Sequence, residues 1–173
     1  MNKKIDSNAI AAAFDSVYEF NDISKQFEGD PREGLDLQLD LIWEEYTETI
    51  AAMDDGCSGY PNIDRRTAEV ELLDGACDLF VVVVGLLQKL QNAGFNVQEA
   101  LQRVTDNNLS KFPTSINPQD WSWYESQKWT PVYNDSYGKF VLKDENGKSR
   151  KPINYCPVNI YDLVPTTLFK EVV

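Results

Sequence analysis

The chain has 173 residues, of which 42% are apolar and 12% aromatic, and this composition is typical of a globular protein rather than a disordered one. Its formal net charge of −12 argues against a protein that coats bare nucleic acid, because phosphates repel such a surface. A phosphate-bearing ligand is compatible with this charge if metal cations stand between ligand and protein. We therefore expect one domain, or one domain with an appendage, and no nucleic-acid partner.

The termini and the cysteines indicate a cytoplasmic protein without a membrane partner. The first residues, MNKKIDSNAIAAAF, are too polar for a signal peptide, and the apolar stretch 79–87 is too short to cross a bilayer. Three scattered cysteines, Cys57, Cys77 and Cys156, make an odd number without metal-ligand spacing, and we interpret them as reduced thiols.

Histidine is missing from the sequence. This excludes the Ser-His and Cys-His nucleophile pairs and imidazole zinc sites, which are common catalytic solutions. Any chemistry must therefore use carboxylates, lysine, tyrosine or a hard metal ion.

Four helices are predicted over the first two thirds of the chain. Ser7 is a candidate N-cap for a helix over about 8–27, and Gly29-Asp30-Pro31 ends it. A second helix is expected over about 32–53, followed by the loop DDGCSGYPNID. Asp64 or Thr67 caps a third helix that ends near residues 92–94, and a fourth covers about 97–108.

The composition changes after residue 111. Prolines stop helix formation, tryptophans crowd residues 121–129, and YGKFVLKDENGKSRKPINY alternates like a strand around an Asn146-Gly147 turn. We expect an all-α core of four to five helices over residues 1–112. Residues 113–173 then form an extension with a small β-hairpin, either as part of the same domain or as an oligomer interface.

The predicted second helix carries two carboxylates in an unusual place. Its broad apolar stripe is formed by Leu35, Leu39, Ile42, Tyr46, Ile50 and Met53. Its polar face is formed by Asp36, Asp40, Glu44 and Thr47. Glu45 and Glu48 fall on a third face, which they share with the apolar side chains of residues 37, 41 and 52. A carboxylate pair among apolar side chains is not an ordinary solvated pair, whereas Glu44 is ordinary by this test.

The predicted third helix repeats the pattern. Its expected core face consists of Val70, Leu73, Cys77, Phe80 and Val84. Glu71, Asp74 and Asp78 lie beside it within an arc of about 60°. Two such helices packed together would gather about five acids, which a cation makes tolerable, and oxygen ligands favour Mg²⁺ or Mn²⁺. A solvated acidic face is the alternative, and for Asp78 a capping role, or one behind the ligands, also stays open.

The end of the predicted fourth helix reads DNNLSKF, with Asn108 and Lys111 three residues apart. A lysine here can pair with a phosphate oxygen, and an asparagine can orient it. An ordinary helix C-terminus is the alternative, because Asn and Lys are common there.

These motifs together resemble the all-α nucleoside triphosphate pyrophosphohydrolases. The ordered set is Glu45-x-x-Glu48, Glu71-x-x-Asp74 and Asn108-x-x-Lys111. That superfamily includes MazG, dimeric dUTPases, dCTP pyrophosphatases and phosphoribosyl-ATP pyrophosphohydrolase. SVYEFN is similar to the aromatic first-helix element of the phage-type MazG-like branch, NNLSKF to its closing motif, and KDENGKSRKPINY to its C-terminal extension.

The resemblance implies a MazG-like helical bundle assembled as a homo-oligomer, a tetramer or else a dimer, located in the host cytoplasm if the chain is phage-encoded. It implies a Mg²⁺ (or Mn²⁺) cluster held by Glu45, Glu48, Glu71 and Asp74, with Asp78 added from spacing alone. The implied reaction converts a nucleoside triphosphate and water to a monophosphate and diphosphate. Asn108 and Lys111 would contact the phosphates. The expected catalytic set is Glu48, Glu45 and Glu44, with Glu44 or Glu48 taking the proton.

Base selection is less constrained. Phe14, Phe20, Asn21 and Trp43 can stack on or hydrogen-bond a base, with core packing as the alternative for the aromatic residues. A purine deoxynucleotide such as dGTP is the expected substrate. A phosphoribosyl-ATP pyrophosphohydrolase and a non-catalytic nucleotide-binding or interaction module of the same fold remain as alternatives. Basic residues near the hairpin turn, Lys148, Arg150 and Lys151, either close over the phosphates or form a solvated turn, and we favour the latter.

Overall fold

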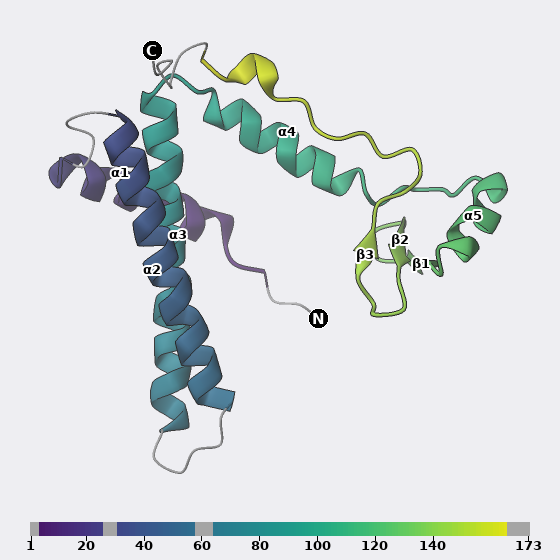
Figure 1. The fold of residues 1–173 in the computed structure, drawn as a ribbon, viewed down its shortest axis with the longest axis horizontal. Helices are drawn as coiled ribbons and strands as arrows, with labels where there is room; N and C mark the ends of the chain where they lie inside the picture. Colours follow the sequence, from purple (N-terminus) through teal and green to yellow (C-terminus); the bar gives the residue numbers. More distant parts are fainter. Residues whose placement is uncertain (1–3, 26–30, 58–63, 166–173) are drawn as a thin grey trace, which may run out of the picture. The chain divides into compact units, whose positions relative to one another are not determined.

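The computed structural model describes residues 4–25, 31–57 and 64–165. The chain is mostly helical, with a small three-stranded antiparallel sheet near its C-terminus (Figure 1). It divides into two compact units, residues 1–95 with 165–173, and residues 96–164. The division therefore falls at residue 96 rather than at the expected residue 112, because the fourth helix belongs with the C-terminal segment.

Three helices build the first unit: α1 (Ser7–Ile23), α2 (Pro31–Cys57) and α3 (Arg65–Asn92). The N-cap of α1 is Asp6, whose carboxylate accepts a hydrogen bond from the backbone N–H of Asn8, rather than the predicted Ser7. Asp64 caps α3 by accepting from the N–H of Arg66, which selects it over Thr67. Both caps satisfy backbone donors that have no partner inside the helix.

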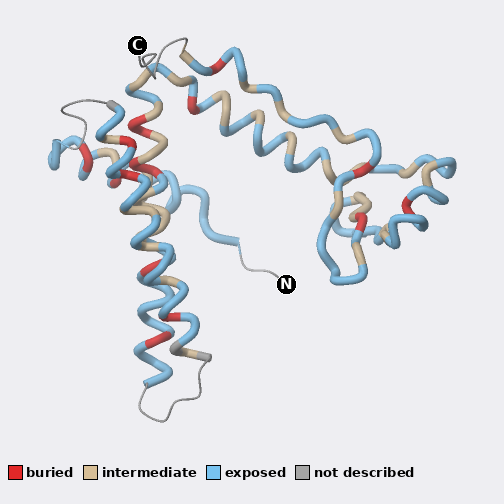
Figure 2. The backbone as a smooth tube through the Cα atoms, viewed as in Figure 1, coloured by how far each residue is buried: buried red, intermediate tan, exposed pale blue. Residues whose placement is uncertain are grey.

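The helices α2 and α3 run antiparallel along each other (Figure 1). The less exposed positions of α2 recur at alternating steps of three and four, at residues 35, 38, 42, 45, 49, 52 and 56. The corresponding series in α3 is 68, 75, 78, 82, 85 and 89, so the two helices meet along a coiled-coil-like seam. Buried residues follow this seam in Figure 2.

Glycines allow a close approach at two points of the seam. A Cβ atom at Gly75 would lie 2.6 Å from Thr49 Oγ1, and one at Gly85 would lie 2.9 Å from Gln38 Nε2. The amide of Gln38 donates to the carbonyl of Val82 at 2.8 Å across the same contact. The seam is therefore formed by small and polar residues instead of by the large apolar side chains that the sequence favoured.

The predicted core faces of α2 and α3 are largely wrong for the chain as it stands. Only Leu35 of the expected α2 stripe is buried, and only Val84 of the expected α3 face. The exposed members are Leu39, Tyr46, Ile50 and Met53 on α2 and Val70, Leu73 and Cys77 on α3. The physical reason is that small residues let the helix backbones approach, so the contact rotates away from the bulky stripe.

The second unit begins with α4 (Val97–Leu109) and continues through η1 (Pro118–Asp120) and α5 (Trp121–Ser126). Three strands follow, β1 (Thr130–Asn134), β2 (Lys139–Lys143) and β3 (Ser149–Arg150), and then η2 (Tyr161–Leu163). The predicted hairpin at Asn146-Gly147 is confirmed between β2 and β3, with Gly147 at φ +75°. Sequence analysis did not foresee α5 or β1, which pairs antiparallel with β2.

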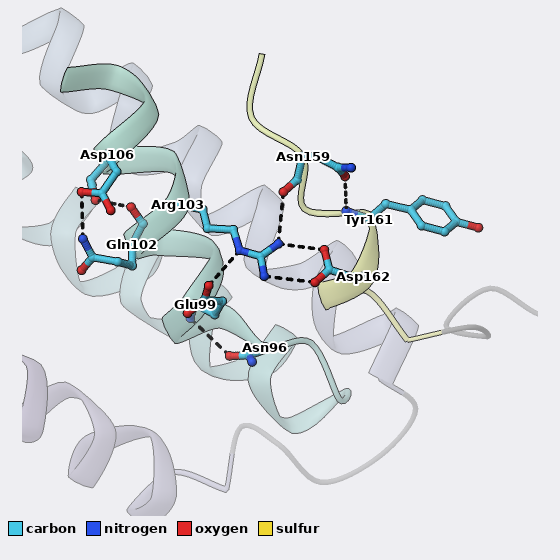
Figure 3. Close-up of polar contacts among 9 residues, drawn as sticks. Asn96, Glu99, Gln102, Arg103, Asp106, Asn159, Tyr161 and Asp162 are labelled. Atoms are coloured by element: carbon cyan, nitrogen blue, oxygen red, sulfur yellow. Dashed lines mark hydrogen bonds and ion pairs between the residues drawn. The ribbon is translucent and has the colours of Figure 1, made fainter. Parts of the chain in front are cut away.

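An extended segment after β3 returns along α4. Asn107 Nδ2 donates to the carbonyl of Cys156 at 2.7 Å. Nearer the start of α4, Arg103 binds both carboxylate oxygens of Asp162 and the carbonyl of Asn159 (Figure 3). The hydrogen bond from Arg103 lowers the pKa of Asp162 below its ordinary value. These contacts hold the return segment against α4 at both ends of the helix.

Candidate functional site

A pocket of about 360 Å³ opens between α2 and α3. The carboxylates of Glu48 from α2 and of Glu71, Asp74 and Asp78 from α3 line it. The remaining lining residues are small: Ala51, Ala52 and Gly75. The pocket thus combines acidic groups from two helices with side chains that leave space between them.

The local cause of this arrangement is helical spacing on both partners. Glu71, Asp74 and Asp78 stand three and four residues apart and so share one side of α3. Across the seam, Gly75 meets Thr49, which places the next turn of α2, with Glu45, beside the turn of α3 that carries Asp78. The antiparallel pairing therefore brings the two predicted acid motifs together.

Glu45 reports the electrostatics of the cluster. Its side chain is half-buried in the seam, and burial is the main cause that raises the pKa of its carboxyl above the ordinary value. The negative charges of Asp78, Glu48, Glu44 and Asp74 raise that pKa further, in that order. Within the described residues, no lysine or arginine forms an ion pair with any of these acids. Their mutual repulsion is therefore not offset by a protein cation.

The predicted ligands are thus gathered in part. Four of the five line the pocket, and Glu45 lies in the adjoining seam, whereas Glu44 is exposed on α2. In the described ranges, no three acidic or cysteine side chains converge closely enough to hold a metal ion as they stand. The donor chemistry fits a hard divalent cation, because every candidate ligand is a carboxylate oxygen. Side-chain rotation of the two glutamates would be needed to bring their oxygens together.

The residues predicted to contact a base lie in different settings. Phe14 packs edge-to-face on Phe80, with ring centroids 5.5 Å apart, and Asn21 is buried, where its amide donates to Gln88 at 2.9 Å. Both attach α1 to α3. Phe20 and Trp43 are exposed, Trp43 by 65%. The structure therefore gives Phe14 and Asn21 a packing role and leaves Phe20 and Trp43 available at the surface.

Asn108 and Lys111 lie at the end of α4 in the second unit, where the Lys111 ammonium donates to Asn108 Oδ1 at 2.6 Å. Tyr155, from the return segment, lies beside them, and both Lys111 and Lys151 approach its ring. Sequence analysis named neither Tyr155 nor its contact with Lys151. No local signal could have found it, because the contact joins segments more than forty residues apart.

No protein-family model, no curated protein and no solved structure matches this chain. Among the described helices, none combines the length and the apolar character that a membrane span requires.

Proposed function

We propose that the chain is a metal-dependent nucleoside triphosphate pyrophosphohydrolase of the MazG-like all-α type. It would hydrolyse a nucleoside triphosphate between the α and β phosphates, giving a monophosphate and diphosphate. The observation that carries this proposal is the pocket between α2 and α3, which is lined by carboxylates from both predicted acid motifs. An uncompensated acid cluster of this kind is unfavourable for folding alone and favours a functional explanation.

In this proposal Glu48, Glu71, Asp74 and Asp78, with Glu45 beside them, would hold Mg²⁺ or Mn²⁺. Bound there, the cation would supply charge neutralisation for the phosphate oxygens and a lowered pKa for a coordinated water. Glu48 lines the pocket and Glu44 is its solvent-exposed neighbour one turn away, so either carboxylate can accept the proton of the attacking water.

A homo-oligomer, a tetramer or else a dimer, forms part of the proposal. Large apolar side chains stay exposed along both long helices, among them Leu37 and Trp43 on α2 and Leu73 on α3. Such patches are typical of surfaces that a partner covers. A second copy of the chain would bury them and cover the neighbourhood of the acidic pocket.

The test is diphosphate release from the four dNTPs and four NTPs, each with Mg²⁺ or Mn²⁺, starting with dGTP. Glu48→Gln keeps the size of the side chain but removes a pocket carboxylate, and we expect it to lower the rate by about 100-fold or more. Glu69→Gln is the matched control, because Glu69 is an exposed acid of α3 outside the pocket. Release by wild type and Glu69→Gln, but not by Glu48→Gln, supports the proposal.

Two outcomes would count against it. If wild type releases no diphosphate from any of the eight nucleotides while folded and supplied with metal, the proposed reaction is wrong, and phosphoribosyl-ATP becomes the next substrate to try. If Glu48→Gln is as active as wild type, the acidic pocket is not where the reaction takes place.

A further inference from the structure

Two lysines that are far apart in the sequence meet at one aromatic ring in the second unit. The ammonium of Lys111 lies 5.8 Å from the centroid of the Tyr155 ring, and that of Lys151 lies 4.7 Å from it. Both distances are within the range of a cation–π contact. Lys111 follows α4, whereas Lys151 comes directly after β3, so the fold itself brings the two positive charges together.

The ring between them is fixed in place. The hydroxyl of Tyr155 donates to Asn107 Oδ1, and the amide of Asn107 donates to the carbonyl of Cys156. Lys111 is oriented in turn by its hydrogen bond to Asn108 Oδ1. This bond uses the oxygen of the Asn108 amide and leaves its NH₂ group as a further donor. The last turn of α4 and the return segment thus present several donors around one half-buried ring.

The two ammonium groups have no carboxylate partner within the described residues. Other cations of this unit do: Arg103 pairs with Asp162, Lys128 with Glu145 and Arg150 with Asp144. Residues 96–164 contain eight basic and eight acidic residues, so the net charge of −12 belongs to the rest of the chain. The cluster around Tyr155 is therefore a positive site on a neutral unit of an acidic protein.

We propose that Lys111, Lys151, Asn108 and Tyr155 form a binding site for a diphosphate group. Two ammonium donors and an amide donor around one ring suit an anion with several charged oxygens, and a diphosphate has them. This revises the interpretation of Lys151 as part of a solvated turn. That the group is the diphosphate product, or the β and γ phosphates of the substrate, rests on the proposed function. The site itself rests on the contacts around Tyr155.

The experiment is calorimetric titration of the full chain with inorganic diphosphate and, separately, with orthophosphate, in buffer containing a chelator. We expect diphosphate to bind at least tenfold more tightly than orthophosphate. Lys111→Gln and Lys151→Gln should each weaken diphosphate binding by tenfold or more, and Lys151→Arg should retain it within threefold. Lys148→Gln is the matched control, because Lys148 is an exposed lysine of the same hairpin that makes no contact with Tyr155.

The control should bind diphosphate within twofold of wild type. Equal losses in Lys148→Gln and Lys151→Gln would show that general positive charge, and not this site, attracts the anion. Absence of measurable binding by folded wild type would also overturn the inference. Circular dichroism of each variant checks the fold, which both exposed lysine changes should leave intact.

Failure of the site and failure of the proposed function can be told apart. Glu48→Gln should stop hydrolysis but leave metal-free diphosphate binding unchanged. If wild type hydrolyses no nucleotide yet binds diphosphate through Lys111 and Lys151, the site stands without the proposed reaction. If nucleotides are hydrolysed and Lys151→Gln binds diphosphate as wild type does, the reaction stands without this site.

Discussion

Gly75 tests the packing that creates the acidic pocket. In Gly75→Ala, the new methyl carbon would lie 2.6 Å from Thr49 Oγ1 and 3.4 Å from Thr49 Cα. The first distance is well below an ordinary van der Waals contact of about 3.5 Å. Rotation of Thr49 would relieve the overlap only by breaking its hydrogen bond to the carbonyl of Glu45, at 2.7 Å. The alternative is separation of α2 and α3 at the pocket.

The expected magnitude follows from two opposing effects. Overpacking a tight contact destabilises by about 1–3 kcal/mol, whereas replacing a helical glycine by alanine stabilises by about 1 kcal/mol. Gly75→Ala should therefore lower the free energy of unfolding by about 0–2 kcal/mol. Gly56→Ala is the control, because its methyl carbon would lie 3.5 Å from Ala68 Cβ, an ordinary contact on the same seam. It should be neutral or mildly stabilising.

The assay is urea unfolding of Gly75→Ala, Thr49→Ala and the double variant. Thr49→Ala removes the hydroxyl that the new methyl group meets, so the two changes should show a favourable interaction free energy of about 1–2 kcal/mol. Diphosphate release should fall in Gly75→Ala and recover in part in the double variant. The packing argument is refuted if Gly75→Ala is as stable as Gly56→Ala, or if the two changes are additive.

Four further predictions concern charge and assembly. Because burial and neighbouring acids raise the pKa of Glu45 above 4.5, its contribution to stability is lost as pH rises through that pKa; at pH 7 without metal, Glu45→Gln should raise the thermal midpoint by about 1–2 °C. Millimolar Mg²⁺ should raise the midpoint of wild type but not of Glu71→Gln, and no shift in wild type would contradict a cation site. Since the pKa of Asp162 is lowered, its bond with Arg103 stabilises above pH 3.8 and weakens as pH falls; Arg103→Gln should speed amide exchange in residues 151–164 at neutral pH, with the difference vanishing in acid. Trp43→Asp should lower the native mass measured by light scattering if the exposed α2 face joins copies of the chain.

The helices of the first unit were predictable because their signals are local. Asp64 as a cap, the breaker around Pro31 and the glycine after α3 all act within a few residues of the helix ends. The buried faces were not predictable from apolar patterning. The seam uses Gly75, Gly85 and Gln38 instead, and which face a long helix turns toward its neighbour depends on how closely the two backbones can approach.

The candidate sites differ in the same way. Four acids of the pocket were predictable, because their helical spacing already placed them on one side of each helix before the two helices were paired. The meeting of Lys111, Tyr155 and Lys151 was not, because it depends on a return segment without periodicity whose position is set by hydrogen bonds to α4. Non-local placement of this kind leaves no trace in a single sequence.

The seam between α2 and α3 carries a conflict that helps to locate function. Glu45 and Asp78 occupy positions of the three-and-four series that elsewhere hold Leu35, Ala52 and Val82, and their like charges raise the pKa of Glu45. A seam optimised for stability would carry apolar side chains there, because they pack without desolvating a charge. Glu45→Leu should therefore stabilise the fold without metal while removing a proposed ligand. A local violation of this kind, inside a contact that is otherwise consistent, is the physical reason to place the chemistry at the acids rather than elsewhere on the seam.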